Sequence, residues 1–224
     1  MSALRGWLGE KMTTLGMWLF LDKKVYRRFH DVIVPTSNGT TQIDHLLVSS
    51  FGVFVIETKN MKGWIFGSED QPKWTQSLYG KKYSFQNPLR QNFRHTKCLG
   101  EHLDLDPAVL HSIIFFIGEC TFKTPMPSNV LRSGLRSHVR SYQQILLSNS
   151  EINRVMQAIQ SLKDDHSLNH RNHMRSLRER HSSTTTCPKC GSELVERTAK
   201  KGANAGSKFL GCAAFPKYRY TKRA

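Results

Sequence analysis

The pattern of apolar and polar positions in the first two thirds of the chain predicts a mixed α/β domain. Apolar residues recur at three- and four-residue steps between Leu4 and Leu19, which is the spacing of an amphipathic helix. Four runs dense in β-branched and aromatic residues follow, separated by tight-turn signals, and they predict strands. Connections this short require antiparallel pairing, because a parallel crossover needs a dozen or more residues. The runs are residues 25–35, 40–48, 52–59 and 63–67.

The pattern then changes to helices around one further strand. Residues 89–103 have a helical pattern after Asn87-Pro88, and proline suits the first turn of a helix. Residues 109–117 form an apolar run typical of a strand covered on both faces. Helices are expected at residues 137–147 and 150–162, the second with Ser150 and Glu151 at its cap. The fold class is therefore α/β, a mixed sheet flanked by helices.

Charge divides the chain and points to a polyanionic partner. Lys and Arg number 33 against 17 Asp and Glu, a formal charge of +16. Residues 163–224 carry 14 basic and 5 acidic side chains in little more than a quarter of the length. Such an excess favours nucleic acid first and an anionic membrane surface second. We expect a domain at 1–162, a polar basic linker at 163–186 and a small knuckle at 187–224.

Targeting signals and cysteine usage favour the cytoplasm. The apolar run at residues 15–21 is shorter than the ~20 residues of a membrane span. Asp22-Lys23-Lys24 closes that run and no small-residue cleavage site follows, so neither a signal peptide nor a membrane span is expected. Five cysteines, three of them after residue 186, do not form a secreted disulfide framework. No small-molecule cofactor is expected, and the sequence leaves the oligomeric state open.

Two acids and a lysine at strand ends are candidates for metal-assisted chemistry. Residues two apart in a strand point to the same face, so Glu57 and Lys59 should project together from the end of an apolar strand. Asp44 lies on the paired strand and can lie beside Glu57. Two carboxylates repel each other unless a cation lies between them, and Mg²⁺ binds through one or two carboxylates, waters and phosphate oxygens. This arrangement suits hydrolysis of a phosphodiester, with the ammonium of Lys59 holding the water or stabilising developing charge.

Spacing alone does not decide between this site and a solvated strand end. An acid two residues before a lysine is expected by chance in a chain of this composition, and Asp22 and Lys24 show the same spacing. Asp44 is more informative, because it lies inside an Ile-Asp-His-Leu-Leu-Val run and a buried carboxylate needs a partner.

An ordered set of motifs resembles the NERD (nuclease-related) domain over about residues 9–120. The family is assigned to the PD-(D/E)XK nuclease superfamily, which implies a restriction-endonuclease-like fold and an Mg²⁺- or Mn²⁺-dependent nuclease. The resemblance implies catalytic roles for Asp44, Glu57 and Lys59, with Asp44 and Glu57 as metal ligands. It also implies a role for Glu10 on the first helix, with Gln76 and Gln91 as weaker candidates that order water or backbone. The motifs are Gly39-Thr-Thr-Gln-Ile-Asp-His-Leu-Leu-Val48, Gly52-Val-Phe-Val-Ile-Glu-Thr-Lys-Asn60, Gly63-Trp-Ile-Phe-Gly67, Trp74 and Asn87-Pro-Leu-Arg-Gln91.

The C-terminal knuckle carries part of a zinc site. Cys187-Pro-Lys-Cys190 is half of a tetrahedral thiolate site, and Cys212 offers one further ligand. The segment from Cys187 to Arg219 resembles the C4 zinc finger at the C-terminus of type IA DNA topoisomerases, whose last cysteine aligns with Tyr218. Two alternatives remain open at this point. Either three cysteines hold zinc with water or His181, or the metal has been lost and Tyr218 packs inside.

Cations and aromatic rings alternate in the knuckle, a composition that suits phosphate contact and base stacking. DNA, double- or single-stranded, is therefore the expected partner, and a basic solvated tail is the alternative. The candidate DNA-binding residues are Lys200, Lys201, Lys208, Phe209, Phe215, Lys217 and Arg219.

Three functions are compatible with these patterns. The first is a DNA-binding, metal-dependent deoxyribonuclease, either endonuclease or exonuclease. The second is a DNA-binding module on a nuclease scaffold without turnover, and the third is a factor associated with a topoisomerase. A complete topoisomerase is excluded, because no segment is large enough for strand passage. Trp64 and Trp74 are expected to pack in the core or at a sheet edge, and His95 to be a surface or core histidine.

Overall fold

The computed structural model describes residues 21–189, 191–216 and 219–223. The expected helix from Leu4 to Leu19 lies outside these residues. The chain forms two compact units. The first consists of the chain through Val34 together with Gln42–Asp164, and the second of Pro35–Thr41 together with the chain from Asp165 onward.

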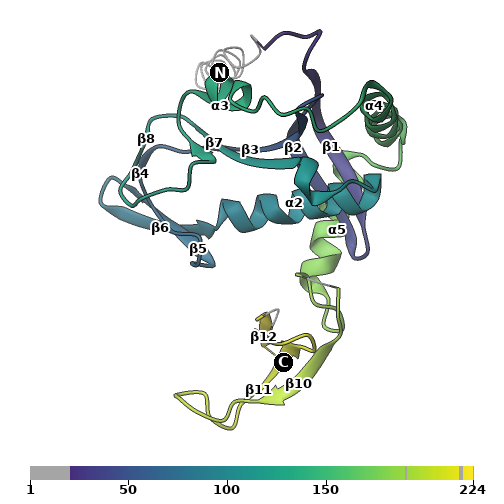
Figure 1. The fold of residues 1–224 in the computed structure, drawn as a ribbon. Helices are drawn as coiled ribbons and strands as arrows, with labels where there is room; N and C mark the ends of the chain where they lie inside the picture. The colour runs from purple at the N-terminus through teal and green to yellow at the C-terminus, as the bar shows by residue number, and fades with distance from the viewer. Residues whose placement is uncertain (1–20, 190, 217–218, 224) are drawn as a thin grey trace, which may run out of the picture. The chain divides into compact units, whose positions relative to one another are not determined.

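The first unit is built on a five-stranded mixed sheet with the strand order β1-β2-β3-β7-β9 (Figure 1). β2 and β3 pair antiparallel, as their short connection predicts, whereas β3–β7 and β7–β9 pair parallel across longer connections. The strands are β1 (Arg27–Thr36), β2 (Gly39–Ser49), β3 (Gly52–Asn60), β7 (Leu110–Ile117) and β9 (Val130–Leu131).

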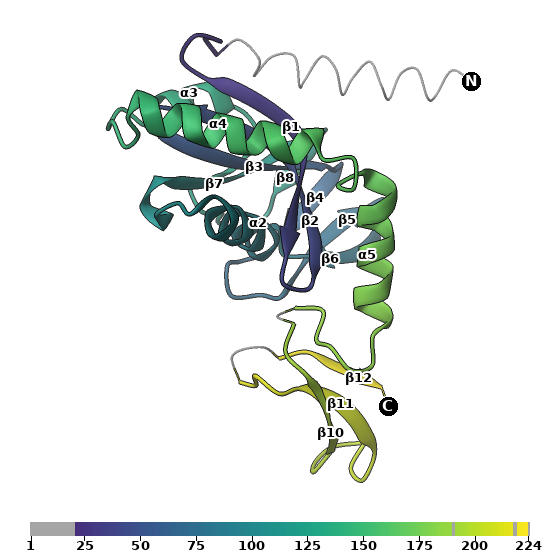
Figure 2. The ribbon, with the colours of Figure 1, turned by 90° about the vertical axis from the view of Figure 1, so that its right-hand side faces the viewer.

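Helices cover both faces of this sheet, so its central strands are apolar on both sides. Residues 53–56 of β3 are fully buried. α2 (Pro88–Leu103) lies on one face, where Nδ2 of Asn92 donates to the carbonyl oxygens of Val55 and Ile113. α3 (Leu135–Arg140) packs its apolar residues against the other face. α4 (Asn149–Asp164) runs beside β1 (Figure 2). The predicted fold class, a mixed α/β sheet flanked by helices, is confirmed and is consistent with a nuclease-like fold.

A second sheet of four short strands follows the order β6-β5-β4-β8. Its inner face packs on the main sheet through a cluster that includes Ile65, Trp74 and Phe116. Trp74 is fully buried, as expected, but Trp64 is 53% exposed and belongs to neither the core nor an edge strand. The strands are β4 (Gly63–Phe66), β5 (Lys73–Leu78), β6 (Lys81–Gln86) and β8 (Cys120–Phe122).

The two helices expected after residue 136 are present with different ends. The expected helix at 137–147 is the shorter α3, followed by an extended segment. Ser148, rather than Ser150, caps α4. Its Oγ accepts from the backbone N–H of Glu151 and its own N–H donates to Oε2 of Glu151, a reciprocal capping box.

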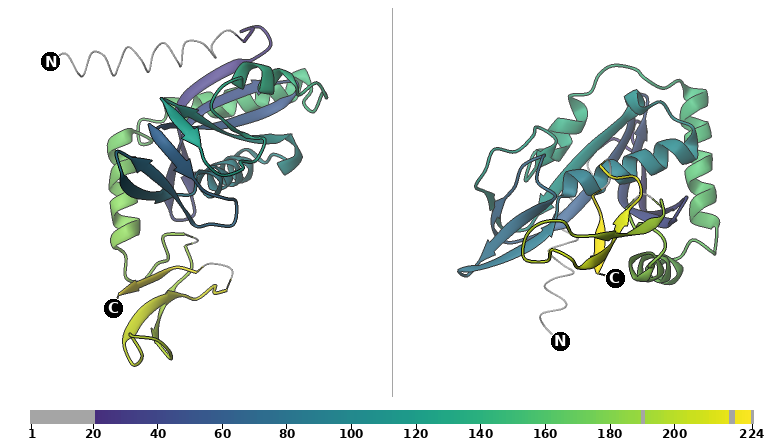
Figure 3. Two further views of the ribbon diagram at one scale, coloured as in Figure 1. Left: turned by 90° about the vertical axis from the view of Figure 1, so that its left-hand side faces the viewer. Right: turned by 90° about the horizontal axis from the view of Figure 1, so that it is seen from below.

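The second unit contains α5 (His170–Ser182) and a three-stranded antiparallel sheet, shown in yellow and yellow-green in Figure 3. The turn between β1 and β2 belongs to this unit, where Thr40 shares a 2.7 Å hydrogen bond with Nδ1 of His173. The remaining elements are η1 (Pro107–Val109) in the first unit and β10 (Leu194–Thr198), β11 (Lys208–Cys212) and β12 (Thr221–Arg223) in the second. None of the helices described is long and apolar enough to cross a membrane.

Asn87 joins the start of α2 to the loop before β5. It is fully buried, and its Oδ1 accepts from the N–H of Leu89, which caps the helix. Its Nδ2 lies 2.7–3.1 Å from the carbonyl oxygens of Ser68, Glu69 and Gln71. One side chain therefore fixes where α2 begins and closes the loop around it.

We expect Asn87→Ala to lower the free energy of unfolding by about 2–3 kcal/mol, because the substitution leaves buried carbonyl groups without partners. Asp106→Ala, which removes the exposed cap of η1, should cost at most about 1 kcal/mol. Urea unfolding of both variants measures the difference. Equal costs would contradict the role of Asn87 in closing the loop.

Candidate active site and nucleic-acid interface

Glu57 is a buried carboxylate at the C-terminal end of β3. Its side chain is 3% exposed, whereas that of Lys59, two positions on, is 21% exposed. Nζ of Lys59 donates to Oε1 of Glu57 at 2.6 Å. The alternation of a strand thus brings the acid and the lysine to one face, as the sequence predicts.

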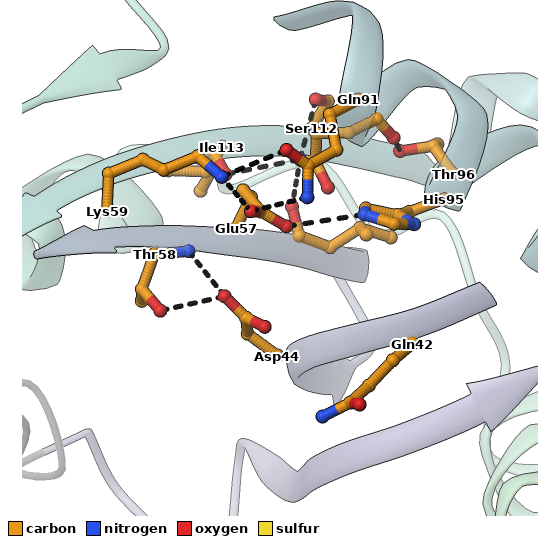
Figure 4. A network of polar contacts seen from close by, with 12 residues as sticks. Gln42, Asp44, Glu57, Thr58, Lys59, Gln91, His95, Thr96, Ser112 and Ile113 are labelled. Carbon is orange, nitrogen blue, oxygen red and sulfur yellow. Dashed lines mark hydrogen bonds and ion pairs between the residues drawn. The ribbon is translucent and has the colours of Figure 1, made fainter. Parts of the chain in front are cut away.

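Helix α2 supplies two further side chains to Glu57. Nε2 of Gln91 donates to Oε1 of Glu57 at 2.8 Å, and Oε1 of Gln91 accepts from Nζ of Lys59 at 2.9 Å. Gln91 therefore bridges the acid and the lysine, as Figure 4 shows. Nε2 of His95 lies 3.3 Å from Oε2 of Glu57, a contact too poorly aligned for a normal hydrogen bond.

The sequence did not point to His95 as a member of this site. A signal was present, because Gln91 and His95 are four residues apart and so share one face of a helix. The sequence does not tell which face of α2 turns toward the sheet. In the structure this orientation is set by Asn92, which donates to the carbonyl oxygens of Val55 and Ile113.

Asp44 lies beside this cluster. The β2–β3 register pairs His45 with Ile56. Continued by one residue, the same register places Asp44 opposite Glu57. Its Oδ2 accepts from the backbone N–H and from Oγ1 of Thr58, at 2.9 and 2.8 Å. The carboxylate of Asp44 thus turns toward Thr58, while that of Glu57 turns toward α2 (Figure 4).

The pKa values of the two carboxyl groups are shifted in opposite directions. Burial raises the pKa of Asp44, and the negative charge of Glu57 raises it further against the hydrogen bonds from Thr58. Burial alone would raise the pKa of Glu57 as well, but the contact with His95 and the charge of Lys59 outweigh it, so this pKa is lowered. The surroundings therefore favour the ionised form of Glu57 and disfavour the ionised form of Asp44.

The other sequence candidates lie apart from this cluster or outside the described residues. Gln76 is on β5 of the four-stranded sheet, where its Nε2 donates to the carbonyl oxygen of Lys62 rather than to the group around Glu57. Glu10 lies outside the described residues.

The C-terminal sheet brings two of the three knuckle cysteines together. Cys187 and Cys212 are buried in one cluster with Leu194, and Leu210 and Tyr220 pack against it. Cys190 and Tyr218 lie outside the described residues. The structure thus places the first and third cysteines in one buried cluster beside the sheet.

The opposite face of this sheet carries a row of cations and rings. Strand register places Phe209 between Arg197 of β10 and Arg223 of β12. The guanidinium of Arg197 lies 5.7 Å from the ring centroid of Phe215, which is 54% exposed. The sequence did not single out Arg197, because cross-strand neighbours follow from register rather than from spacing along the chain.

The remaining DNA-binding candidates are distributed around this sheet. Lys200 and Lys201 are exposed in the loop between β10 and β11, and Arg219 is exposed before β12. Lys208 pairs with Glu196 at 2.8 Å, which reduces the charge that it offers to a phosphate. Lys217 lies outside the described residues.

Comparison with known proteins identifies the family. The model of the nuclease-related domain matches residues 5–117, and the model of the topoisomerase DNA-binding C4 zinc finger matches residues 184–224. The chain belongs to the nuclease-related domain family. An uncharacterized protein of Bacillus anthracis is 39% identical over 161 residues, which cover 69% of this chain and 75% of that protein. No solved structure matches the chain.

Both matches agree with the resemblances found in the sequence. The nuclease-related domain indicates a nuclease-related function and the use of a divalent metal, and the zinc ribbon indicates zinc and DNA binding. The first match ends at the last residue of β7 and so contains Asp44, Glu57, Lys59, Gln91 and His95.

The acidic pair of the nuclease-related domain fits a hard divalent cation. Burial and then the negative charge of Glu57 raise the pKa of Asp44, and Oε2 of Glu57 is buried without an aligned hydrogen bond. A cation would relieve both costs. Among the described residues no group of three or more His, Cys, Asp or Glu could hold a metal ion.

The raised pKa of Asp44 predicts how stability responds to pH. A carboxylate whose pKa is raised by folding stabilises the fold while it is protonated, and this contribution is lost as pH rises through the folded pKa. We therefore expect Asp44→Asn to match the wild type in stability at about pH 4 and to exceed it near pH 7 in the absence of metal. Urea unfolding across this range measures the difference.

Mg²⁺ should narrow that gap by stabilising the wild-type chain more than Asp44→Asn. Asp106→Asn, at an exposed aspartate on another element, serves as the control and should respond to neither pH nor Mg²⁺ beyond the wild type. A pH-independent difference between Asp44→Asn and the wild type would show that Asp44 does not carry the expected charge penalty.

Proposed function

We propose that the nuclease-related domain hydrolyses phosphodiester bonds of DNA in a metal-dependent reaction, while the C-terminal sheet holds the DNA. The observation that carries this proposal is the hydrogen-bonded group formed by the buried Glu57 and the half-buried Lys59 and Gln91, with Asp44 level with Glu57 on the neighbouring strand. An acid, a lysine and an amide joined in this way at the end of a strand have the chemical types that hydrolysis of a phosphodiester requires.

Each residue has a distinct role in this proposal. Glu57 and Asp44 hold a divalent cation, which when bound lowers the pKa of water and neutralises charge on the phosphate. Lys59, whose side chain is more exposed than that of Glu57, places its ammonium beside the phosphate oxygens. Gln91 fixes the lysine and the acid in one orientation, so that little reorganisation is needed during the reaction.

The C-terminal sheet contributes affinity rather than chemistry. Arg197 and Arg223 lie on either side of Phe209 on one face, and such a row can neutralise phosphates while a base stacks on the ring. Affinity should therefore fall steeply with salt and show little sequence preference.

We also propose that zinc, held by Cys187, Cys190 and Cys212, is bound weakly. The position of the fourth cysteine is occupied by Tyr218, and a neutral phenol is a poor zinc ligand compared with a thiolate. The apolar contacts of Leu194, Leu210 and Tyr220 with the buried cysteines support a sheet that persists without metal.

A second candidate function, DNA binding without turnover, is favoured by one observation. Oε1 of Glu57 is already occupied by Lys59 and Gln91, and Oδ2 of Asp44 by Thr58. Because these oxygens already have hydrogen-bond partners, the ion pair of Glu57 and Lys59 can also have a purely structural role, in which Gln91 joins α2 to β3.

We expect the wild-type chain to degrade plasmid or single-stranded DNA in the presence of Mg²⁺ or Mn²⁺ and not in the presence of a chelator. Glu57→Gln and Lys59→Met should each lower the rate by at least about 100-fold, because each removes a group that acts on the reacting phosphate. Gel-based cleavage assays measure this.

Lys97→Gln is the matched control, since it removes a lysine that is exposed on α2 and pairs only at the surface with Glu101. It should cut at the wild-type rate. All variants should bind DNA as the wild type does, which separates lost chemistry from lost binding. Salt-sensitive binding without cleavage under any divalent ion would favour the second candidate function.

We expect less than one zinc ion per chain after dialysis against a chelator, with the ribbon still folded. Elemental analysis measures the metal, and an unchanged near-ultraviolet circular dichroism spectrum shows that the aromatic side chains keep their packing. Cys212→Ser should lower the zinc content before dialysis. Zinc that survives the chelator at one ion per chain would contradict a weak three-cysteine site.

A further inference from the structure

The outer face of the four-stranded sheet carries an exposed tryptophan in a cross-strand row that the proposed chemistry does not use. Register aligns Lys82, Ser77, Trp64 and Thr121 across β6, β5, β4 and β8 in a single line. Trp64 is 53% exposed on an inner strand, where its indole could pack only against the solvent-facing side chains of its neighbours. Those neighbours in the row are the small hydroxyl residues Ser77 and Thr121, which leave much of the indole exposed.

A cation lies over this ring. Nζ of Lys123 is 4.5 Å from the centroid of the Trp64 indole, and Lys82 is exposed at the other end of the row. A lysine held against an exposed indole combines a phosphate-binding charge with a surface on which a base can stack. Acidic side chains do not occur at any position of this row, so its charge is complementary to a polyanion.

The turn between β5 and β6 adds a second, independent observation. Tyr79 has φ = 50° and is 92% exposed, and Gly80 follows with φ = 76°. The left-handed region is unfavourable for a tyrosine, and hairpin turns of this kind prefer Asn or Gly there. An exposed aromatic residue kept in a strained turn indicates a role outside the fold.

We propose that Trp64, Lys82, Lys123 and Tyr79 form a docking surface for a single-stranded segment of nucleic acid. Stacking on exposed rings requires unpaired bases, which duplex DNA does not offer, so the surface fits a single strand rather than a duplex. The surface belongs to the first unit, whereas the C-terminal sheet belongs to the second. It depends on nucleic-acid binding by this chain, but not on cleavage.

Binding of the full chain to a fluorescent oligothymidine in the presence of chelator tests this surface. Trp64→Ala should weaken binding about tenfold without changing the salt dependence, because it removes stacking alone. Lys82→Gln and Lys123→Gln should each reduce the slope of log affinity against log salt by about 0.7, because each removes one phosphate contact. Tyr79→Asn should weaken binding while leaving the melting temperature unchanged or raised, since Asn tolerates the left-handed turn.

Two control variants match these changes on another element. Phe93→Ala removes an aromatic residue that is 69% exposed on α2, and Lys97→Gln removes an exposed lysine there. Neither should alter binding of the oligothymidine. If they weaken it as much as Trp64→Ala and Lys123→Gln do, or if Trp64→Ala weakens duplex binding equally, the docking surface is refuted.

The outcome is separable from that of the proposed nuclease. Loss of single-strand binding in Trp64→Ala supports the surface whether or not the wild-type chain cuts DNA. Wild-type binding by Trp64→Ala, in a chain whose cleavage depends on Glu57, refutes the surface and leaves the nuclease intact.

Discussion

The structure around the site depends on how one buried carboxylate is compensated. Glu57 is at the end of a strand that is apolar on both faces, and a carboxylate buried there without partners would be strongly destabilising. Lys59 from the same strand and Gln91 from α2 provide hydrogen bonds to it, and His95 adds a polar contact. This compensation holds α2 against β3 and determines which groups face the solvent.

The amide residues of α2 fix that helix in place. Asn87 sets its start, Asn92 attaches its middle to the carbonyl oxygens of β3 and β7, and Gln91 joins the acid to the lysine. Asn87 and Gln91 each donate and accept, so they bridge groups of opposite character without adding charge, whereas Asn92 acts through its donors alone. The helix therefore positions the site with neutral groups, and the formal charges remain on β2 and β3.

The chain combines this site with two surfaces in which cations lie beside rings. On the C-terminal sheet the row is formed by Arg197, Phe209 and Arg223, and on the four-stranded sheet Lys123 lies over Trp64. Both rows arise from strand register and both lie opposite a buried apolar cluster. An alternating strand can place a core residue on one face and a binding residue on the other, so small sheets can combine stability with a basic surface.

The sequence by itself determined the elements that have a strong local signal. Periodicity located β2, β3, β7 and α2 nearly to the residue, because alternation and helical spacing are properties of neighbouring positions. Glu57 and Lys59 were predicted to meet for the same reason. Whether Asp44 and Glu57 share a metal remains a prediction. The tertiary structure alone decided that His95 faces Glu57, that Trp64 is exposed while Trp74 is buried, and that Arg197 lies beside Phe209. These outcomes depend on which face a helix or strand turns toward its partners, and residues distant in the chain set that choice.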